Sequence, residues 1–153
     1  MAVDWRAAGA DQALVAAAMR GLRRVRTEEE GQAAYNDVLD AIGHNHSGWL
    51  YDAAGPAAPI LVRIAQDAEG WARRTALEIL IDCLAWARPE QRYTDADGHI
   101  ATVQDALYRA VASVAADLQT WAADRDALAP LSKSASDLLE ALHEEKPLQP
   151  GDR

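Results

Sequence analysis

Apolar residues recur at helical spacing along most of the chain, with short polar breaks between the periodic stretches. The first stretch predicts a helix from Asp11 to Arg26, and Gly9 indicates a short separate turn before it. The side chains expected on the buried face of this helix are Leu14, Ala18, Leu22 and Val25. Spacings of three and four residues keep these positions on one side of a helix, so the helix needs a partner to cover it.

A second helix is predicted to begin at Thr27. Thr27 is followed three residues later by Glu30, which is the spacing of a capping box. Gly43 follows the last periodic residue, as a glycine often does at the C-terminal end of a helix. The apolar stripe between them consists of Tyr35, Val38, Leu39 and Ile42. The pattern therefore predicts a helix over residues 27–43.

A polar connection over residues 44–48 leads to a third helix, which contains two prolines. The regular part is expected to begin near Pro56 to Pro59, because proline is tolerated in the first turn of a helix, and to bury Ile60, Leu61 and Ile64. After a break at residues 67–70, residues 71–87 form the most apolar stretch. One face of it consists of Ala72, Ala76, Ile79, Leu80, Cys83 and Trp86. Such an apolar helix should lie between neighbouring helices.

The second half of the chain has a less regular pattern. Residues 88–99 are expected to be an irregular polar connection, residues 100–118 a helix, and residues 121–128 a shorter helix that ends before Pro130. Ser132 or Ser134 could cap a final helix that presents Leu138, Leu139 and Leu142. The sequence thus predicts an all-α fold in one domain, residues 1–143, with a flexible tail at 144–153.

Charge narrows the classes of function. The chain has 153 residues, 24 acidic against 15 Lys and Arg, and a formal net charge of −9. This balance argues against a nucleic-acid binder, because phosphate binding depends on clustered Lys and Arg, and it suits a basic partner. The same net charge would also be found if the acidic residues served only to keep the protein in solution. No leading signal sequence and no apolar run of membrane-spanning length is present, so a cytoplasmic protein is expected.

Three features invite a chemical interpretation. His44 and His46 could share a metal ion, but zinc needs three or four protein ligands and no further one lies nearby. The D-A-D-G-H-I stretch at 95–100 has the look of a calcium loop, yet that register puts Gln104 where a bidentate Glu is required. Cys83 lies in an apolar run, which favours a buried, inert thiol. The sequence therefore predicts no metal site, no cofactor and no catalytic residue.

Several segments together resemble a family of small bacterial HEAT-repeat-like proteins, which are short α-solenoids. These segments, between residues 4 and 87, are D-W, A-G-A, A-Y-N-D-V-L-D-A-I, H-S-G-W-L-Y-D-A-A, A-A-P-I-L-V and R-R-T-A-L-E-I-L. The resemblance implies a short right-handed α–α superhelix of about six to seven stacked helices. It also implies a structural turn and following helix that include His46, Gly48, Tyr51 and Pro59. Ser47 and Ile60 depart from the family pattern.

The family resemblance implies a non-enzymatic module that binds another protein, in some members as an immunity-like protein beside a toxin. Together with the charge, it suggests a basic partner, a basic toxin being one possibility. The candidate partner-binding residues are acidic residues of loops and of solvent-exposed helix faces: Asp52, Asp67, Glu69, Asp95 and Asp97. The alternatives are a small hydrolase-type enzyme that uses the turn from His44 to Tyr51, and a HEAT-like nucleic-acid-binding protein that uses the arginines from Arg20 to Arg26. The protein is expected to be a monomer or a weak homodimer, with Trp121 and the last helix at the dimer face, and no membrane contact is expected.

Overall fold

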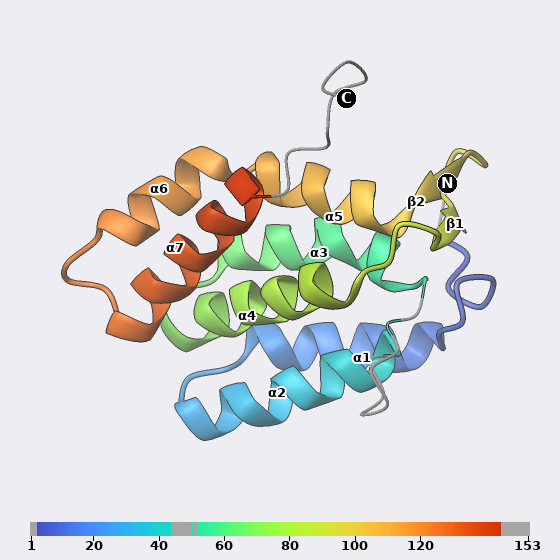
Figure 1. The fold of residues 1–153 in the computed structure, drawn as a ribbon. Coiled ribbons are helices and arrows are strands. Elements are labelled where there is room, and N and C mark those ends of the chain that lie inside the picture. Colours follow the sequence, from blue (N-terminus) through green and yellow to red (C-terminus); the bar gives the residue numbers. More distant parts are fainter. Residues whose placement is uncertain (1–2, 44–49, 51, 145–153) are drawn as a thin grey trace, which may run out of the picture.

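The computed structural model of the chain describes residues 3–43, 50 and 52–144, which form seven helices and one short hairpin (Figure 1). The elements are α1 (Gln12–Arg23), α2 (Glu28–Ala41), α3 (Ala54–Asp67), α4 (Gly70–Trp86), β1 (Arg92–Thr94), β2 (Ile100–Thr102), α5 (Val103–Ala112), α6 (Ala115–Ala123) and α7 (Ala129–Glu144). The prediction of a mainly helical protein is confirmed. Among the described residues, no helix combines the length and apolarity needed to span a membrane.

Both of the first two helices begin where their capping residues predict, and α2 also ends as predicted, whereas α1 ends at Arg23 and not at the predicted Arg26. The side chain of Asp11 accepts hydrogen bonds from two backbone N–H groups in the first turn of α1. The Thr27 hydroxyl accepts from the N–H of Glu30 (3.2 Å), and the Glu30 carboxylate accepts from the N–H of Arg26 (2.6 Å). Gly43 has a φ of 86°, a left-handed conformation that glycine adopts without steric cost.

The buried face of α1 differs from the predicted one at a single position. Leu14 is 61 % exposed, whereas Ala18, Leu22 and Val25 are buried as predicted. The buried residues within α1 itself are Val15, Ala18, Met19 and Leu22. These residues follow the spacing i, i+3, i+4, i+7, so the true stripe begins one residue later than the predicted one.

The helices are arranged in two layers, with α1, α3 and α5 in one and α2, α4 and α7 in the other (Figure 1). Helix α3 packs between α1 and α5, and α4 packs between α2 and α7 while it also covers α3. The prediction that the apolar helix at 71–87 lies between neighbours is therefore confirmed. Trp86, which the sequence places on the buried face of this helix, is 44 % exposed, so the prediction is wrong at this residue.

Residues 92–102 form an antiparallel hairpin in place of the predicted irregular connection and the start of the next helix. Strand β1 pairs with β2 in the register Tyr93 to Ala101. The ring of Tyr93 lies against Gly55 in the first turn of α3, where a Cβ atom would come within 2.6 Å of a ring carbon. The side-chain amide of Gln91 donates to the carbonyl of Leu50 (2.6 Å). These contacts dock the hairpin on the N-terminal end of α3.

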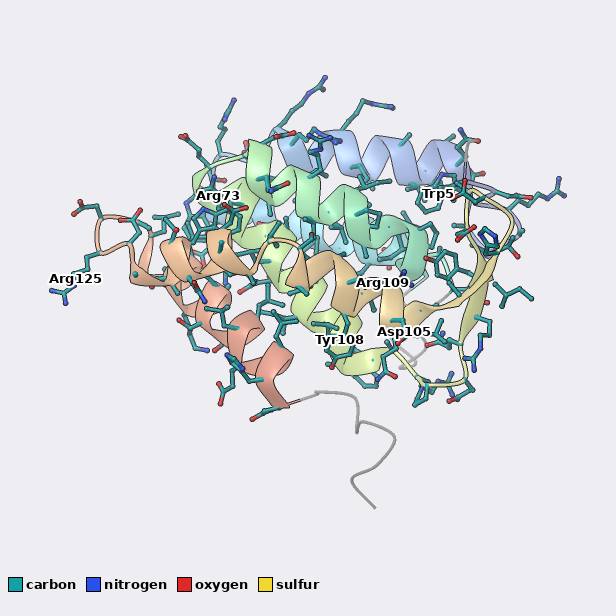
Figure 2. The ribbon with its side chains drawn as sticks, turned by 90° about the horizontal axis from the view of Figure 1, so that it is seen from above. Trp5, Arg73, Asp105, Tyr108, Arg109 and Arg125 are labelled. Atoms are coloured by element: carbon teal, nitrogen blue, oxygen red, sulfur yellow. The ribbon has the colours of Figure 1, made fainter. Side chains whose placement is uncertain are left out.

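The predicted helix at 100–118 is broken, and the predicted helix at 121–128 is wrong. Residues 100–102 belong to β2, and Val114, with φ −114° and ψ 19°, separates α5 from α6. The residues after Ala123 connect α6 to α7, and Arg125 in this connection points away from the body (Figure 2). Val114 and Leu118 are both buried, so the apolar stripe continues across the break and conceals it from a periodicity analysis.

The last helix begins earlier than predicted. It starts at Ala129 with Pro130 in its first turn, where a proline fits, so Ser132 and Ser134 lie inside the helix and do not cap it. Their hydroxyls donate to carbonyl oxygens, Ser132 to Ala122 (2.7 Å) and Ser134 to Pro130 (2.9 Å). The predicted tail at 144–153 lies outside the described residues except for Glu144, which ends α7.

Candidate functional site

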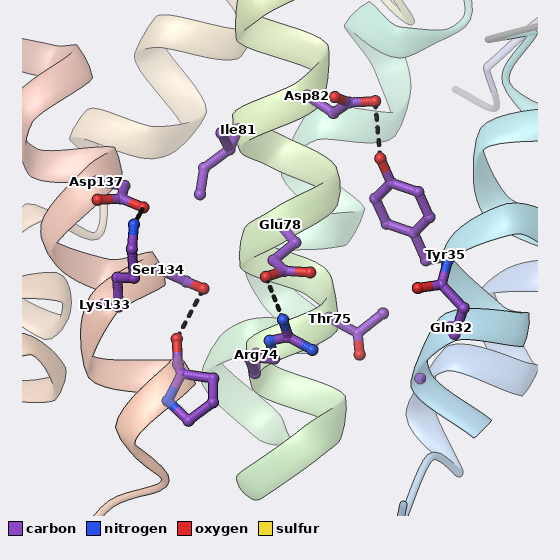
Figure 3. Close-up of a pocket in the computed structure, with 12 residues that line it drawn as sticks. Gln32, Tyr35, Arg74, Thr75, Glu78, Ile81, Asp82, Lys133, Ser134 and Asp137 are labelled. Atoms are coloured by element: carbon purple, nitrogen blue, oxygen red, sulfur yellow. Dashed lines mark hydrogen bonds and ion pairs between the residues drawn. The ribbon is translucent and has the colours of Figure 1, made fainter. Parts of the chain in front are cut away.

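A groove of about 660 Å³ runs along α4 between α2 and α7 (Figure 3). Helix α4 forms its floor, because the polar side of this helix is not covered by a neighbour. Helices α2 and α7 form the two walls. The lining residues of α4 are Arg74, Thr75, Glu78, Ile81 and Asp82, and the walls add Gly31, Gln32 and Tyr35 from α2 and Pro130, Lys133, Ser134 and Asp137 from α7.

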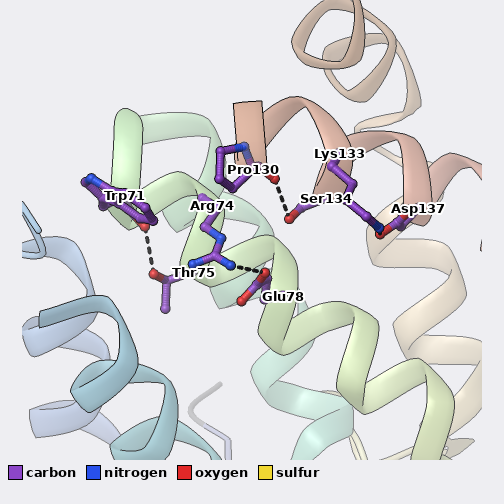
Figure 4. Close-up of polar contacts among 8 residues, drawn as sticks. All are labelled: Trp71, Arg74, Thr75, Glu78, Pro130, Lys133, Ser134 and Asp137. Carbon is purple, nitrogen blue, oxygen red and sulfur yellow. Dashed lines mark hydrogen bonds and ion pairs between the residues drawn. The ribbon is translucent and has the colours of Figure 1, made fainter. Parts of the chain in front are cut away.

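Two ion pairs hold charged groups in place along the groove (Figure 4). A guanidinium nitrogen of Arg74 lies 2.6 Å from Glu78 Oε1, and the guanidinium carbon lies 5.3 Å from the centre of the Trp71 ring. On the α7 wall, opposite α2, Lys133 Nζ lies 2.6 Å from Asp137 Oδ2. Each pair joins residues four apart on one helix, so the charges are positioned by the helices that carry them.

The two hydroxyl groups of the groove are engaged within their own helices. Thr75 Oγ1 donates to the carbonyl of Trp71 (2.7 Å), and Ser134 donates to the carbonyl of Pro130. Catalysis by a hydroxyl nucleophile needs a base within hydrogen-bonding reach of that hydroxyl. In the described part of the groove, the acceptor of each of these hydroxyls is a backbone carbonyl oxygen and not a basic side chain.

A tyrosine from one wall reaches the floor. The hydroxyl of Tyr35 donates to Asp82 Oδ2 (3.0 Å) and joins α2 to α4. Burial raises the pKa of Tyr35 far above its ordinary value, and the negative charge of Asp82 raises it further. The phenol therefore stays protonated and remains a hydrogen-bond donor throughout the physiological pH range.

Close approach of α2 to α4 depends on Gly31. A Cβ atom at this position would come within 2.8 Å of Thr75 Oγ1, and Thr75 is only 2 % exposed. Thr75 is β-branched and its hydroxyl donates a hydrogen bond within its own helix, so a change of its rotamer would cost free energy. Gly31 therefore sets the width of the groove on the α2 side.

Gly31→Ala should lower the free energy of unfolding by about 1 kcal/mol, because overpacking of about 1–3 kcal/mol exceeds the helix propensity that alanine adds. Urea unfolding followed by circular dichroism measures the change. Gly21→Ala is the matched control: Gly21 has open space around it in α1, so this variant should be stabilised slightly. Thr75→Ala should rescue Gly31→Ala. A Gly31→Ala protein as stable as the parent would contradict the steric explanation.

Charge is distributed unevenly between the two layers. Helices α2, α4 and α7 carry ten acidic residues against three basic ones, whereas α1, α3 and α5 carry four arginines against two aspartates. The acidic set consists of Glu28, Glu29, Glu30, Asp37, Asp40, Glu78, Asp82, Asp137, Glu140 and Glu144. The groove thus lies in the middle of the acidic layer.

The five predicted partner-binding acids do not come together, and none of them lines the groove. Asp67 ends α3, and Glu69 follows in the connection to α4. Asp95 and Asp97 lie in the hairpin, which is docked at the other end of α3, roughly 20 Å away for a helix of this length (Figure 1). Asp52 precedes α3 at that same end.

Asp95 organises the loop of the hairpin. Its Oδ1 accepts hydrogen bonds from the N–H groups of Asp97 and His99, both at 2.9 Å. These backbone hydrogen bonds, above all that from His99, lower the pKa of Asp95, and the loop closes with Gly98 at a φ of 84°. Ligand atoms of Asp95, Asp97 and His99 lie within 4.8 Å of one another, but the loop geometry alone explains this arrangement.

The remaining sequence candidates fall on structural positions or outside the described residues. His46, Gly48 and Tyr51 lie outside the described residues, and so does His44. Pro59 is exposed and lies inside α3, the helix that follows the predicted turn. Cys83 is fully buried, and burial raises the pKa of its thiol, which fits the predicted inert side chain.

Comparison with known proteins found no family model, no curated protein and no solved structure that matches the chain. The resemblance to HEAT-repeat-like proteins therefore remains a prediction.

Proposed function

We propose that the chain is a non-enzymatic protein-binding module that receives a basic segment of its partner in the groove over α4. The observation that carries this proposal is the position of the groove in the layer where acidic residues outnumber basic ones by ten to three. A cationic segment that approaches this layer is attracted by its field before contact, which raises the association rate and favours basic partners over acidic ones. An immunity-like role toward a basic toxin is one form of this function, and it rests on the family resemblance.

The order of the helices supports the HEAT-like interpretation. Successive helices pack as antiparallel neighbours in three places, α1 with α2, α3 with α4 and α6 with α7. The first two pairs each contribute one helix to each layer, which is how α-solenoids stack. In such a stack the helices of one layer line a continuous surface for a partner, and the groove over α4 lies on that surface. The right-handed superhelical twist is part of the proposal.

The groove also suggests the form of the partner segment. Most of its lining is polar, with Ile81 and Pro130 as its larger apolar members. An apolar helix in the groove would remove water from the ion pairs of Arg74 and Lys133 without replacing its hydrogen bonds, which costs free energy. A segment with alternating basic and polar residues can instead share the carboxylates of these pairs.

Binding of a labelled peptide tests the function. A fluorescein-labelled peptide rich in Lys and Arg should bind the protein at low salt, and its Glu-substituted counterpart should not. Asp137→Asn and Glu78→Gln should each weaken binding about tenfold, since each removes a charge from the groove. Asp126→Asn, in the α6–α7 connection, makes the same change of net charge outside the groove and should have little effect. Equal losses for all three variants would refute a groove-specific site.

A further inference from the structure

The three helices that line the groove over α4 run in the same direction (Figure 1). Gly31 of α2 lies beside Thr75 of α4, and Tyr35, one turn later in α2, donates to Asp82, so residue numbers increase together along both helices. Helix α7 runs the same way on the other wall (Figure 1). The groove therefore has an N-terminal end and a C-terminal end, each named after the helix ends that meet there.

The charges that line the groove follow an order from one end to the other. In each ion pair the cation lies nearer the N-terminal end, with Arg74 before Glu78 and Lys133 before Asp137 (Figure 3). Asp82 adds a further carboxylate at the C-terminal end. The positions of Arg74 and Asp82 are separated by roughly 12 Å, the rise of an α-helix over eight residues. The lining is therefore cationic toward one end and anionic toward the other.

This order of charges does not favour the stability of the helices. A helix carries partial positive charge at its N-terminus and partial negative charge at its C-terminus, so an acid that precedes a base by four residues is the more stable arrangement. Both ion pairs of the groove have the reverse arrangement. The last turns of α2 and α4 contain no basic residue, and the last turn of α7 contains only His143. Charges that oppose local stability are typical of a functional surface.

Acidic residues also lie at the N-terminal end of the layer. The glutamates at 28–30 form the first turn of α2, but they precede Gly31, the first residue of α2 that lines the groove. One of them is turned back and accepts from the backbone N–H of Arg26. Helix α2 contains no Lys or Arg, and neither α4 after Arg74 nor α7 after Lys133 contains another. The difference between the two ends therefore depends on the residues that line the groove.

We propose that the groove binds its partner segment in one register, with the basic side chains of the segment at the C-terminal end and neutral or acidic side chains at the N-terminal end. This inference rests on the proposed function and adds the positions of the charges. Ile81 lies between Asp82 on the α2 side and Asp137 on the α7 side (Figure 3). An arginine or lysine of the segment packs its aliphatic carbons on Ile81, and its charged group reaches one of the two carboxylates.

The opposite end of the groove excludes basic side chains. Arg74 and Lys133 repel a second cation there and attract a carboxylate of the segment. An extended segment rises ~3.3 Å per residue, so its basic and acidic positions are about four residues apart. The preferred partner segment thus combines both charges in a fixed order, which a uniformly basic segment does not.

A spin-labelled peptide tests the register on the full chain. The probe has an arginine pair and a glutamate pair about four residues apart, and a nitroxide is attached beside one pair or the other. Beside the arginines, the nitroxide should broaden the amide signals of residues 82–86 and 137–144 more than those of 71–75 and 129–133, and beside the glutamates it should do the reverse. A bound peptide that broadens both ends equally, or in the opposite order, would overturn the register and leave the proposed function standing. If neither this peptide nor the Lys- and Arg-rich one binds, the proposed function itself fails.

Exchange of the α7 ion pair tests the register without a change of net charge. Lys133→Asp with Asp137→Lys should weaken binding of the unlabelled probe at least about fivefold, and the variant should fold, because the exchanged pair has the more stable order. Arg63→Asp with Asp67→Arg is the matched control, since it makes the same exchange on α3 in the other layer and should leave binding unchanged. Unchanged affinity after the α7 exchange, together with losses for Asp137→Asn and Glu78→Gln, would mean that the groove responds to net charge and not to its position.

Discussion

Trp121→Ala should lower the free energy of unfolding by about 3–5 kcal/mol, the loss expected when a large buried aromatic side chain is removed from a core. Trp121 is 9 % exposed, and it is one of only two buried residues of the nine-residue helix α6, with Leu118 the other. Helix α6 packs mainly on α7, so loss of the indole should release α6 before the rest of the molecule.

Denaturant unfolding monitored by circular dichroism measures this change, and hydrogen exchange locates it. Trp86→Ala is the matched control, because Trp86 is 44 % exposed at the end of α4 and its loss should cost about 1 kcal/mol. Amide protection in α6 should fall more than protection in α4. A Trp121→Ala protein that loses less than the Trp86→Ala protein would show that α6 does not depend on the indole.

Trp121 also shows where sequence reasoning reaches its limit. The sequence places this residue in a short helix and suggests it for a dimer face, because a short solenoid with an uncapped apolar end could dimerise there. In the structure the guanidinium carbon of Arg73 lies 4.4 Å from the centre of the Trp121 ring. A contact between residues 48 positions apart is decided by tertiary packing and leaves no local signal.

Local signals predicted the first half of the fold well. Asp11, Thr27, Glu30 and Gly43 satisfy or terminate helix ends through hydrogen bonds and backbone angles that depend on near neighbours. Such effects can be read from sequence because each involves residues within about four positions. The burial of Cys83 was also predicted correctly, because a side chain inside a continuous apolar run is usually buried with it.

The hairpin and the break after α5 could not be predicted in the same way. Strands of three residues carry too little alternation to be recognised, and the D-A-D-G turn between them is equally typical of an irregular loop. The groove was partly visible: Arg74, Glu78 and Asp82 stand on the polar side of their helix at spacings of four. Their neighbours Tyr35 and Lys133 come from distant helices, so the site itself required the structure.

Arg73→Met should lower the free energy of unfolding by about 2–3 kcal/mol, because hydrogen bonds from a charged group are lost and their acceptors remain. Arg73 Nε donates to the carbonyl of Ala65 (2.8 Å), and a second guanidinium nitrogen lies 3.5 Å from the carbonyl of Gln66. These carbonyls belong to the last turn of α3, where the helix itself supplies no donors. Arg73 therefore joins α4 to the end of α3 while it stacks on α6.

Burial lowers the pKa of Arg73, and the charges of Glu69, Asp117 and Asp124 oppose this shift. An arginine remains protonated at physiological pH, so the loss in the methionine variant should not change between about pH 6 and about pH 8, far below the pH at which an arginine titrates. Arg73→Lys keeps the charge but loses the planar guanidinium group. Its free energy of unfolding should therefore lie between that of Arg73→Met and that of the parent.

The neighbouring arginine provides the control for the Arg73 prediction. Arg74→Met removes an ion pair whose side chains are 22 % and 34 % exposed, which should cost less than about 1 kcal/mol. A double-mutant cycle of Arg73→Met with Trp121→Leu should give a coupling of about 1 kcal/mol if the stacking contributes beyond burial. Equal losses for Arg73→Met and Arg74→Met would mean that the end of α3 does not need its donor.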